Sequence, residues 1–186
     1  GGYFSPVGHR RLGSRGPWGN SRGVISADDA IESLKLLPHP EGGFYVETFR
    51  AEELPFELPE RGPRSASTAI YFLLRAGDFS ALHVVSSDEA WHHYLGDPLE
   101  LHCIDPAGAH RALLLGSDLL RGQRPQHVVR RDELQAARVS AGPYGFALCG
   151  CTVAPGFDFA DFRMPPRAEL LAKWPQHREL VAALTR

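Results

Sequence analysis

The stretch GDFSALHVVSSDEAWHHYLG, residues 77–96, decides the fold class. Its first part, Phe79–Val85, is a short apolar segment, and its second part, Glu89–Leu95, mixes aromatic and titratable side chains. The polar residues Ser86-Ser87-Asp88 join the two parts and are typical of a turn. Short segments of this composition bounded by turn residues predict two consecutive β-strands.

The second of these strands groups its side chains by face. Successive side chains of a strand point to opposite sides, so Glu89, Trp91 and His93 share one face and His92 lies on the other. A carboxylate, an indole and an imidazole facing the interior would form a pocket with an apolar wall and a few convergent polar groups. The alternative, in which Trp91 is a core residue and the histidines are structural or exposed, remains open.

The same pattern of short segments and turn signals continues on both sides of this stretch. The further expected strands are Thr68–Leu74, Leu99–Ile104, Ala112–Leu115, His127–Val129, Gln135–Val139 and Phe146–Val153. Strands with turn signals every 8–12 residues are typical of an antiparallel sandwich or barrel. No helical pattern alternates with them, which argues against a parallel α/β fold.

The ends of the chain differ from this β-rich centre. Ser26 is a good helix N-cap and predicts a short N-terminal helix, and residues 167–173 and 176–184 predict a helical tail. Residues 1–26 are rich in arginine and glycine and are expected to be irregular, with one domain over residues 27–186.

Two shorter blocks have a local interpretation. His39-Pro40-Glu41-Gly42-Gly43 predicts a turn, because its glycines permit positive φ, and either Glu41 or Glu47 could line the mouth of a pocket. The sequence Pro155-Gly156 predicts a tight turn, after which Phe157, Phe159 and Phe162 are expected to pack onto the sheets.

Composition limits the possible partners. Hydrophobic residues make up 43% of the chain, charged residues 23%, and the formal net charge is −2, so neither nucleic acid nor an anionic membrane is an expected partner. Cys103, Cys149 and Cys151 form an odd set, which predicts buried, reduced thiols and is compatible with the cytoplasm. The arginine-rich first residues leave an organelle open, if they form a transit peptide.

The residues of the central stretch resemble the first motif of the cupins, in which a glycine precedes His-x-His, a glutamate and a later glycine. His83, Glu89 and Gly96 match this motif, whereas Val85 stands where the second histidine is expected. The counterpart of the second motif, residues 122–135, ends in Gln135 instead of a ligand histidine. Two of the four metal ligands of the cupin pattern are therefore missing.

Four ordered blocks sharpen the resemblance to one cupin branch, the cupin_5 family. These blocks are HPEGGF at 39–44, TAIYFLL at 68–74, SDEAWH at 87–92 and VAPGFD at 153–158. The resemblance implies an all-β jelly-roll barrel, a homodimer, and an architecture like that of dTDP-sugar 3,5-epimerases (RmlC-like), with no firmly assigned reaction. In this family a histidine recurs at the position of His92, whereas strand alternation points His93 inward; a β-bulge would resolve the conflict.

Three functions follow as hypotheses. The first is a barrel that binds a small polar or aromatic metabolite, as a metal-independent, epimerase-like isomerase in which His83 is the general base. In this hypothesis Glu89, Trp91, His93 and Gln135 contact the ligand, and no cofactor is expected. The second is a metal-dependent oxygenase or isomerase that uses His83, Glu89, Gln135 and one of His92 or His93; it is disfavoured because an amide oxygen is a poor ligand for a transition metal. The third is a non-catalytic binding barrel.

Overall fold

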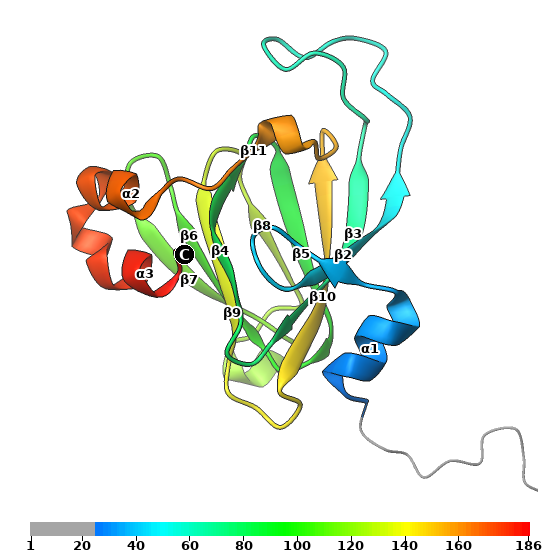
Figure 1. The fold of residues 1–186 in the computed structure, drawn as a ribbon, viewed down its shortest axis with the longest axis vertical. Helices are drawn as coiled ribbons and strands as arrows, with labels where there is room; N and C mark the ends of the chain where they lie inside the picture. The colour runs from blue at the N-terminus through cyan, green and yellow to red at the C-terminus, as the bar shows by residue number, and fades with distance from the viewer. Residues whose placement is uncertain (1–24) are drawn as a thin grey trace, which may run out of the picture.

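The computed structural model describes residues 25–186, whose strands form two antiparallel β-sheets that face each other (Figure 1). The strands of the first sheet, in spatial order, are β1 (Leu37–Pro38), β2 (Phe44–Arg50), β3 (Thr68–Arg75), β10 (Phe146–Ala154), β5 (Asp88–Gly96) and β8 (Gln126–Val129). Those of the second are β11 (Phe162–Arg163), β4 (Phe79–Val85), β9 (Leu134–Val139), β6 (Leu99–Ile104) and β7 (His110–Leu115). Because β4 and β5 lie in different sheets, the corner between them carries the chain from one sheet to the other.

The helices lie outside the two sheets (Figure 1). The helix α1 (Ala27–Leu34) begins at Ser26, whose side chain forms a capping box with Asp29. The C-terminal helices α2 (Arg167–Lys173) and α3 (Arg178–Ala183) follow β11. Short 3₁₀ turns are η1 (Leu119–Arg121), η2 (Phe159–Asp161) and η3 (Pro175–His177). None of the helices in residues 25–186 is long and apolar enough to cross a membrane.

Apolar side chains fill the space between the sheets and the space under the C-terminal helices. Trp91 and Phe72 are both 1% exposed and meet edge to face, with ring centroids 5.6 Å apart. A second cluster joins α2 and α3 to the second sheet; its buried members include Leu82, Ile104, Leu134, Leu170, Trp174 and Val181. Burial of this kind is the dominant favourable contribution to folding.

The prediction of a mostly-β fold in antiparallel sheets is confirmed. The expected jelly-roll barrel is present as two facing sheets, and no strand ladder closes it within residues 25–186. At one pair of edges, β1 and β11 have only two residues each and are too short to join the sheets. At the other pair, the link is an isolated bridge between Leu115 of β7 and Arg124, which precedes β8. The prediction of an irregular segment over residues 1–26 falls almost entirely outside the described residues.

The three cysteines are free and buried, as the sequence predicted. Cys149 and Cys151 point between the sheets from β10, and Gly150 between them faces outward against Tyr94. A Cβ at Gly150 would lie 2.2 Å from the Tyr94 hydroxyl oxygen, so a larger residue would displace that exposed ring from the sheet. The Cys-Gly-Cys sequence is therefore explained by strand packing.

Candidate functional site

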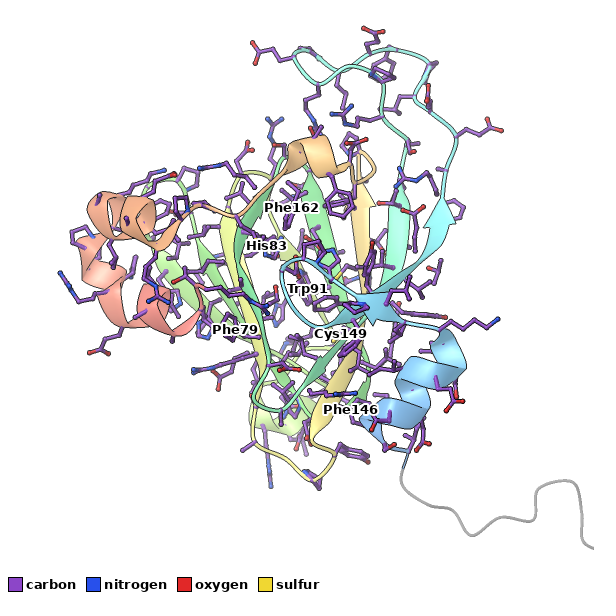
Figure 2. All side chains as sticks on the ribbon, in the orientation of Figure 1. Phe79, His83, Trp91, Phe146, Cys149 and Phe162 are labelled. Atoms are coloured by element: carbon purple, nitrogen blue, oxygen red, sulfur yellow. The ribbon has the colours of Figure 1, made fainter. Side chains whose placement is uncertain are left out.

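A cavity of about 490 Å³ lies at one end of the space between the sheets. Its apolar wall is formed by Leu37, Tyr45, Val46, Ile70, Phe72, Val85, Val153, Phe157, Phe159 and Phe162. Its polar lining is formed by His39, Glu41, Glu47, Arg50, Thr68, His83, Glu89, Cys151 and Asp158. Figure 2 shows His83 beside Phe162, and their ring centroids are 5.3 Å apart. The lining thus combines an aromatic wall with a small set of acids and imidazoles, as small-molecule sites do.

Glu41 enters the cavity from the turn that precedes β2. Gly42 and Gly43 have φ values of 116° and 71°, and a Cβ at Gly42 would lie 2.2 Å from the Phe79 carbonyl oxygen. The Ala81 backbone N–H donates to the Glu41 carbonyl oxygen at 2.8 Å, which holds the turn against β4. The close approach of turn and strand therefore requires glycine and delivers a carboxyl group into the interior.

The surroundings of the Glu41 carboxyl group favour its protonated form. The Ser80 hydroxyl donates to Oε1 at 2.8 Å, while Oε2 lies 3.4 Å from His83 Nε2 and 3.6 Å from His39 Nδ1. Burial raises the pKa of Glu41 to about 8, against the lowering effects of Ser80 and of the Arg186 charge. At neutral pH this side chain is therefore mostly an uncharged acid.

The histidine rings next to Glu41 present nitrogens without protons to it. His83 Nδ1 lies 2.7 Å from the Ala81 carbonyl oxygen, which can only accept, so the proton of the neutral ring sits on Nδ1 and Nε2 is free. His39 Nδ1 accepts from the Glu41 backbone N–H at 3.3 Å. Burial lowers the pKa of His83, although the Glu89 charge and the Ala81 carbonyl act against it. Burial, and then the His83 charge, lower the pKa of His39 to about 4. The Glu41 proton thus faces two basic nitrogens.

Glu89 is fixed by a chain of hydrogen bonds from behind the cavity wall. The Gln135 side-chain amide donates to Glu89 Oε2 at 2.6 Å, and Trp91 Nε1 donates to Gln135 Oε1 at 3.0 Å. Burial raises the pKa of Glu89; the His83 charge opposes this, the Glu41 charge adds to it, and the Gln135 hydrogen bond opposes it. The indole sets which end of the amide faces Glu89, and the amide in turn holds the carboxyl group.

The structure brings three of the predicted site residues together. His83 and Glu89 line the same cavity, and Gln135 bonds to Glu89 from behind it. Trp91 was expected in the pocket wall but lies behind the wall, because its ring packs against Phe72 and its N–H is directed at Gln135. It supports the site without lining it.

His93 does not reach the cavity. It shares the face of Glu89 and Trp91, because it pairs with Cys149 as Trp91 pairs with Cys151, but its Nε2 lies 3.1 Å from the Asp97 carbonyl oxygen near the end of β5. His92 lies on the opposite face, 3.2 Å from Gln126 and 3.3 Å from Thr152. A β-bulge does occur in β5, but it lies between His93 and Leu95, after both histidines. Strand alternation therefore holds from Glu89 to His93, so His92 and His93 lie on opposite faces of β5.

Several site residues were not predicted from the sequence. His39 was assigned to a turn, and Phe157, Phe159 and Phe162 were expected to serve only packing, whereas all four line the cavity. Glu41 and Glu47 were both named as residues of a pocket mouth, and both line the cavity, Glu41 with its carboxyl group buried. The signal for His39 and Glu41 was the HPEGGF block, but only the folded turn shows that it reaches His83.

The residues at the cupin metal positions do not fit a metal. Val85 has no donor atom, and the Gln135 amide oxygen already accepts from Trp91 while its nitrogen faces Glu89. Within residues 25–186, no group of three or more His, Cys, Asp or Glu side chains is arranged to hold a metal ion. We derive no chemistry through a metal at these positions.

Comparison with known proteins agrees with this architecture. The family described as Cupin superfamily (DUF985), Cupin_5, matches residues 28–165. The chain belongs to this family. A hypothetical protein from Leishmania major is similar in structure, with a TM-score of 0.81, 35% identity, and coverage of 87% of this chain and 99% of that one. A protein from Shewanella oneidensis has a TM-score of 0.79, 39% identity, and coverage of 87% and 98%.

More distant cupins share only the fold. Oxalate decarboxylase from Bacillus subtilis matches with a TM-score of 0.51 and 14% identity, over 79% of this chain and 36% of that one. Among curated proteins there is no significant match. The family and the fold are thus shown, and the function has to be argued from the cavity.

Proposed function

We propose that this cupin binds a small molecule with an apolar or aromatic body and a carbonyl group, and moves a proton at the carbon next to that carbonyl. The reaction class is isomerisation or epimerisation without a metal. The observation that carries the proposal is the contact of Glu41 Oε2 with His83 Nε2, at 3.4 Å, inside the cavity. It places an uncharged acid beside an uncharged base.

The proposed step uses both groups. His83 Nε2 takes the proton from carbon, the C–H electron pair forms the enol double bond, and the carbonyl electrons move to oxygen. Glu41 donates its Oε2 proton in a hydrogen bond to that oxygen as negative charge develops. Return of the proton from His83 to a neighbouring carbon on the same face gives the isomer, whereas the epimer forms only after the enol has turned its other face to His83.

Burial suits each group to its part. A base works best when it is unprotonated and close to the operating pH, and burial keeps His83 neutral by lowering its pKa. A carboxylic acid donates a hydrogen bond at pH 7 only if its pKa is raised, as it is for Glu41, at about 8. Glu89, held by Gln135, is the third polar group in reach of the ligand and orients it.

The test is solvent-deuterium exchange, followed by proton NMR, on a panel of small carbonyl compounds that bind to the protein. We expect exchange at the carbon next to the carbonyl in the wild type, loss of exchange in His83→Ala, and exchange slowed about 100-fold or more in Glu41→Gln. His92→Ala is the matched control, since His92 lies on the same strand as Glu89 but on the opposite face. A compound that binds in the cavity and exchanges equally fast with His83→Ala would contradict the proposal, and binding with no exchange would reduce the function to binding alone.

A further inference from the structure

We propose that the cavity selects a cationic ligand, a small molecule that carries a protonated amine on its apolar or aromatic body. This inference rests on the proposed function and names the substrate class of the same site. It follows from the distribution of charged groups around the cavity. The ammonium group would lie against the acid pair formed by Glu41 and Glu89.

The interior of the cavity can become negative but has no cation of its own. Glu41 and Glu89 are 6% and 7% exposed, and both line the cavity. Among the lining residues that the structure describes, Arg50 alone carries a lysine or arginine charge, and its side chain is 44% exposed. Two buried acids whose buried basic neighbours, His39 and His83, are uncharged imidazoles form a site that a cationic ligand would complete.

Arg50 is not free to receive an anion. Its Nε and Nη2 donate to the two carboxylate oxygens of Glu47, at 2.9 and 2.6 Å. Its Nη1 donates to the Ser65 hydroxyl at 3.3 Å and to the Phe157 carbonyl oxygen at 3.2 Å. These bonds occupy four of the five N–H groups of Arg50, so a ligand carboxylate or phosphate could form a two-bond contact with this guanidinium only by displacing Glu47.

The pKa values of the groups inside the cavity also favour a cation over an anion. To receive a cation at pH 7, one member of the acid pair must carry a negative charge; ionising Glu41, with its pKa of about 8, would cost about tenfold in affinity. To receive an anion, an imidazole must gain a proton, and the His39 pKa of about 4 makes this cost about a thousandfold. A negative charge in the interior is therefore less costly at pH 7 than a positive one.

The wall of the cavity suits an ammonium group as well. Tyr45, Phe72, Phe157, Phe159 and Phe162 line it, and rings with negative faces attract a cation that lies over them. An apolar amine would therefore bury its body against these rings while its charge meets the acids. An alcohol of the same shape would gain only the apolar contact.

Binding of the cation must release protons. The titratable groups around the acid pair are His39, His83, Cys151, Glu47, Asp158, Arg50 and Arg186. The two imidazoles are already neutral, and burial raises the pKa of Cys151, so the proton comes from the acid pair. Because ionisation of one acid raises the pKa of the other, loss of a proton from one acid favours the protonated form of the second, which can donate a hydrogen bond in the proposed reaction.

Three probes of the same shape test the inference: benzylamine, benzyl alcohol and benzoate. We expect calorimetry on the full chain at pH 7 to show that benzylamine binds at least about tenfold more tightly than benzyl alcohol, and that benzoate binds more weakly than both. Titration in phosphate and in Tris, which differ in heat of ionisation, should show release of close to one proton with benzylamine and none with benzyl alcohol. In Glu89→Gln and Glu41→Gln the preference for the amine should fall about tenfold, with unchanged affinity for benzyl alcohol.

The control variant is Glu179→Gln, which removes an exposed carboxylate of α3 outside the cavity and should leave all three affinities unchanged. Benzoate binding as tightly as benzylamine would overturn the choice of a cation but leave the proposed function standing. The same holds if the amine preference survives in both acid variants. Failure of all three probes to bind would overturn the aromatic small-molecule site itself, and the proposed function with it.

Discussion

The unfolding free energy of the Glu41→Gln variant, relative to that of the wild type, should increase as the pH rises. The substitution keeps the shape of the side chain and an oxygen that can accept from Ser80, but it removes the ionisable group. In the folded wild type the pKa of Glu41 is raised from 4.5 to about 8 because the group is buried. In the unfolded chain it has its ordinary value.

The sign and size follow from proton linkage. Below pH 4.5 both states hold the proton, so Glu41 makes no pH-dependent contribution. Between 4.5 and about 8 the unfolded chain loses the proton while the folded protein keeps it, so wild-type stability falls as the pH rises and levels off above about 8. At about 1.4 kcal/mol for each unit of pKa difference, the loss reaches about 5 kcal/mol. The variant escapes this loss.

Urea denaturation of both proteins at pH 5 and at pH 8 measures the effect. We expect the difference in unfolding free energy, variant minus wild type, to increase by several kcal/mol between the two pH values, whatever its value at pH 5. His39 and His83 also titrate in this range, but they do so in both proteins and largely cancel. Glu179→Gln, an exposed carboxylate, should show almost no change with pH. A difference for Glu41→Gln that is equal at pH 5 and pH 8 would refute a protonated, buried Glu41.

Three further predictions concern stability and assembly. Trp91→Phe leaves Gln135 Oε1 without its donor and should lower the unfolding free energy in urea denaturation by about 2–3 kcal/mol. The loss should exceed that of the control Trp174→Phe, whose indole makes no hydrogen bond to the described residues, and equal losses would argue against the Trp91–Gln135 bond. Asp161→Asn should lower the unfolding free energy by about 2 kcal/mol at pH 7, because Arg64 and Arg61 lower the Asp161 pKa from 3.8 to about 2. The contribution of Asp161 to stability is present above pH 3.8 and is lost as the pH falls through about 2. A difference between variant and wild type that is as large at pH 2 as at pH 7 would contradict this prediction. Light scattering should give twice the 20.5 kDa mass of one chain if the homodimer implied by the family forms, and a monomer at micromolar concentration would reject it.

Local sequence patterns were sufficient for the strands and for the faces of β5. Period-two alternation places Glu89, Trp91 and His93 on one side and His92 on the other, and the structure keeps this order because the bulge comes after His93. The same rule cannot tell how far along a strand a cavity extends. His93 and Glu89 share a face, yet only Glu89 lines the cavity.

Contacts between distant segments were beyond the reach of these patterns. Glu41 meets His83 because the HPEGG turn folds back onto β4, through the bond from the Ala81 N–H to the Glu41 carbonyl oxygen. The glycines announce a turn, but nothing in their sequence says which strand the turn will touch. For the same reason the phenylalanines after β10 could be predicted to pack but not to enclose a cavity.

Gln135 explains how this cupin can order its site without the ligands that a metal needs. In a metal site the ion would fix the directions of the side chains around it. Here the Trp91 N–H settles the orientation of the Gln135 amide, and the amide fixes Glu89 with a 2.6 Å bond. The glutamine at position 135 is therefore coupled to the buried Trp91 behind it, and the two residues together hold the Glu89 carboxyl group in place.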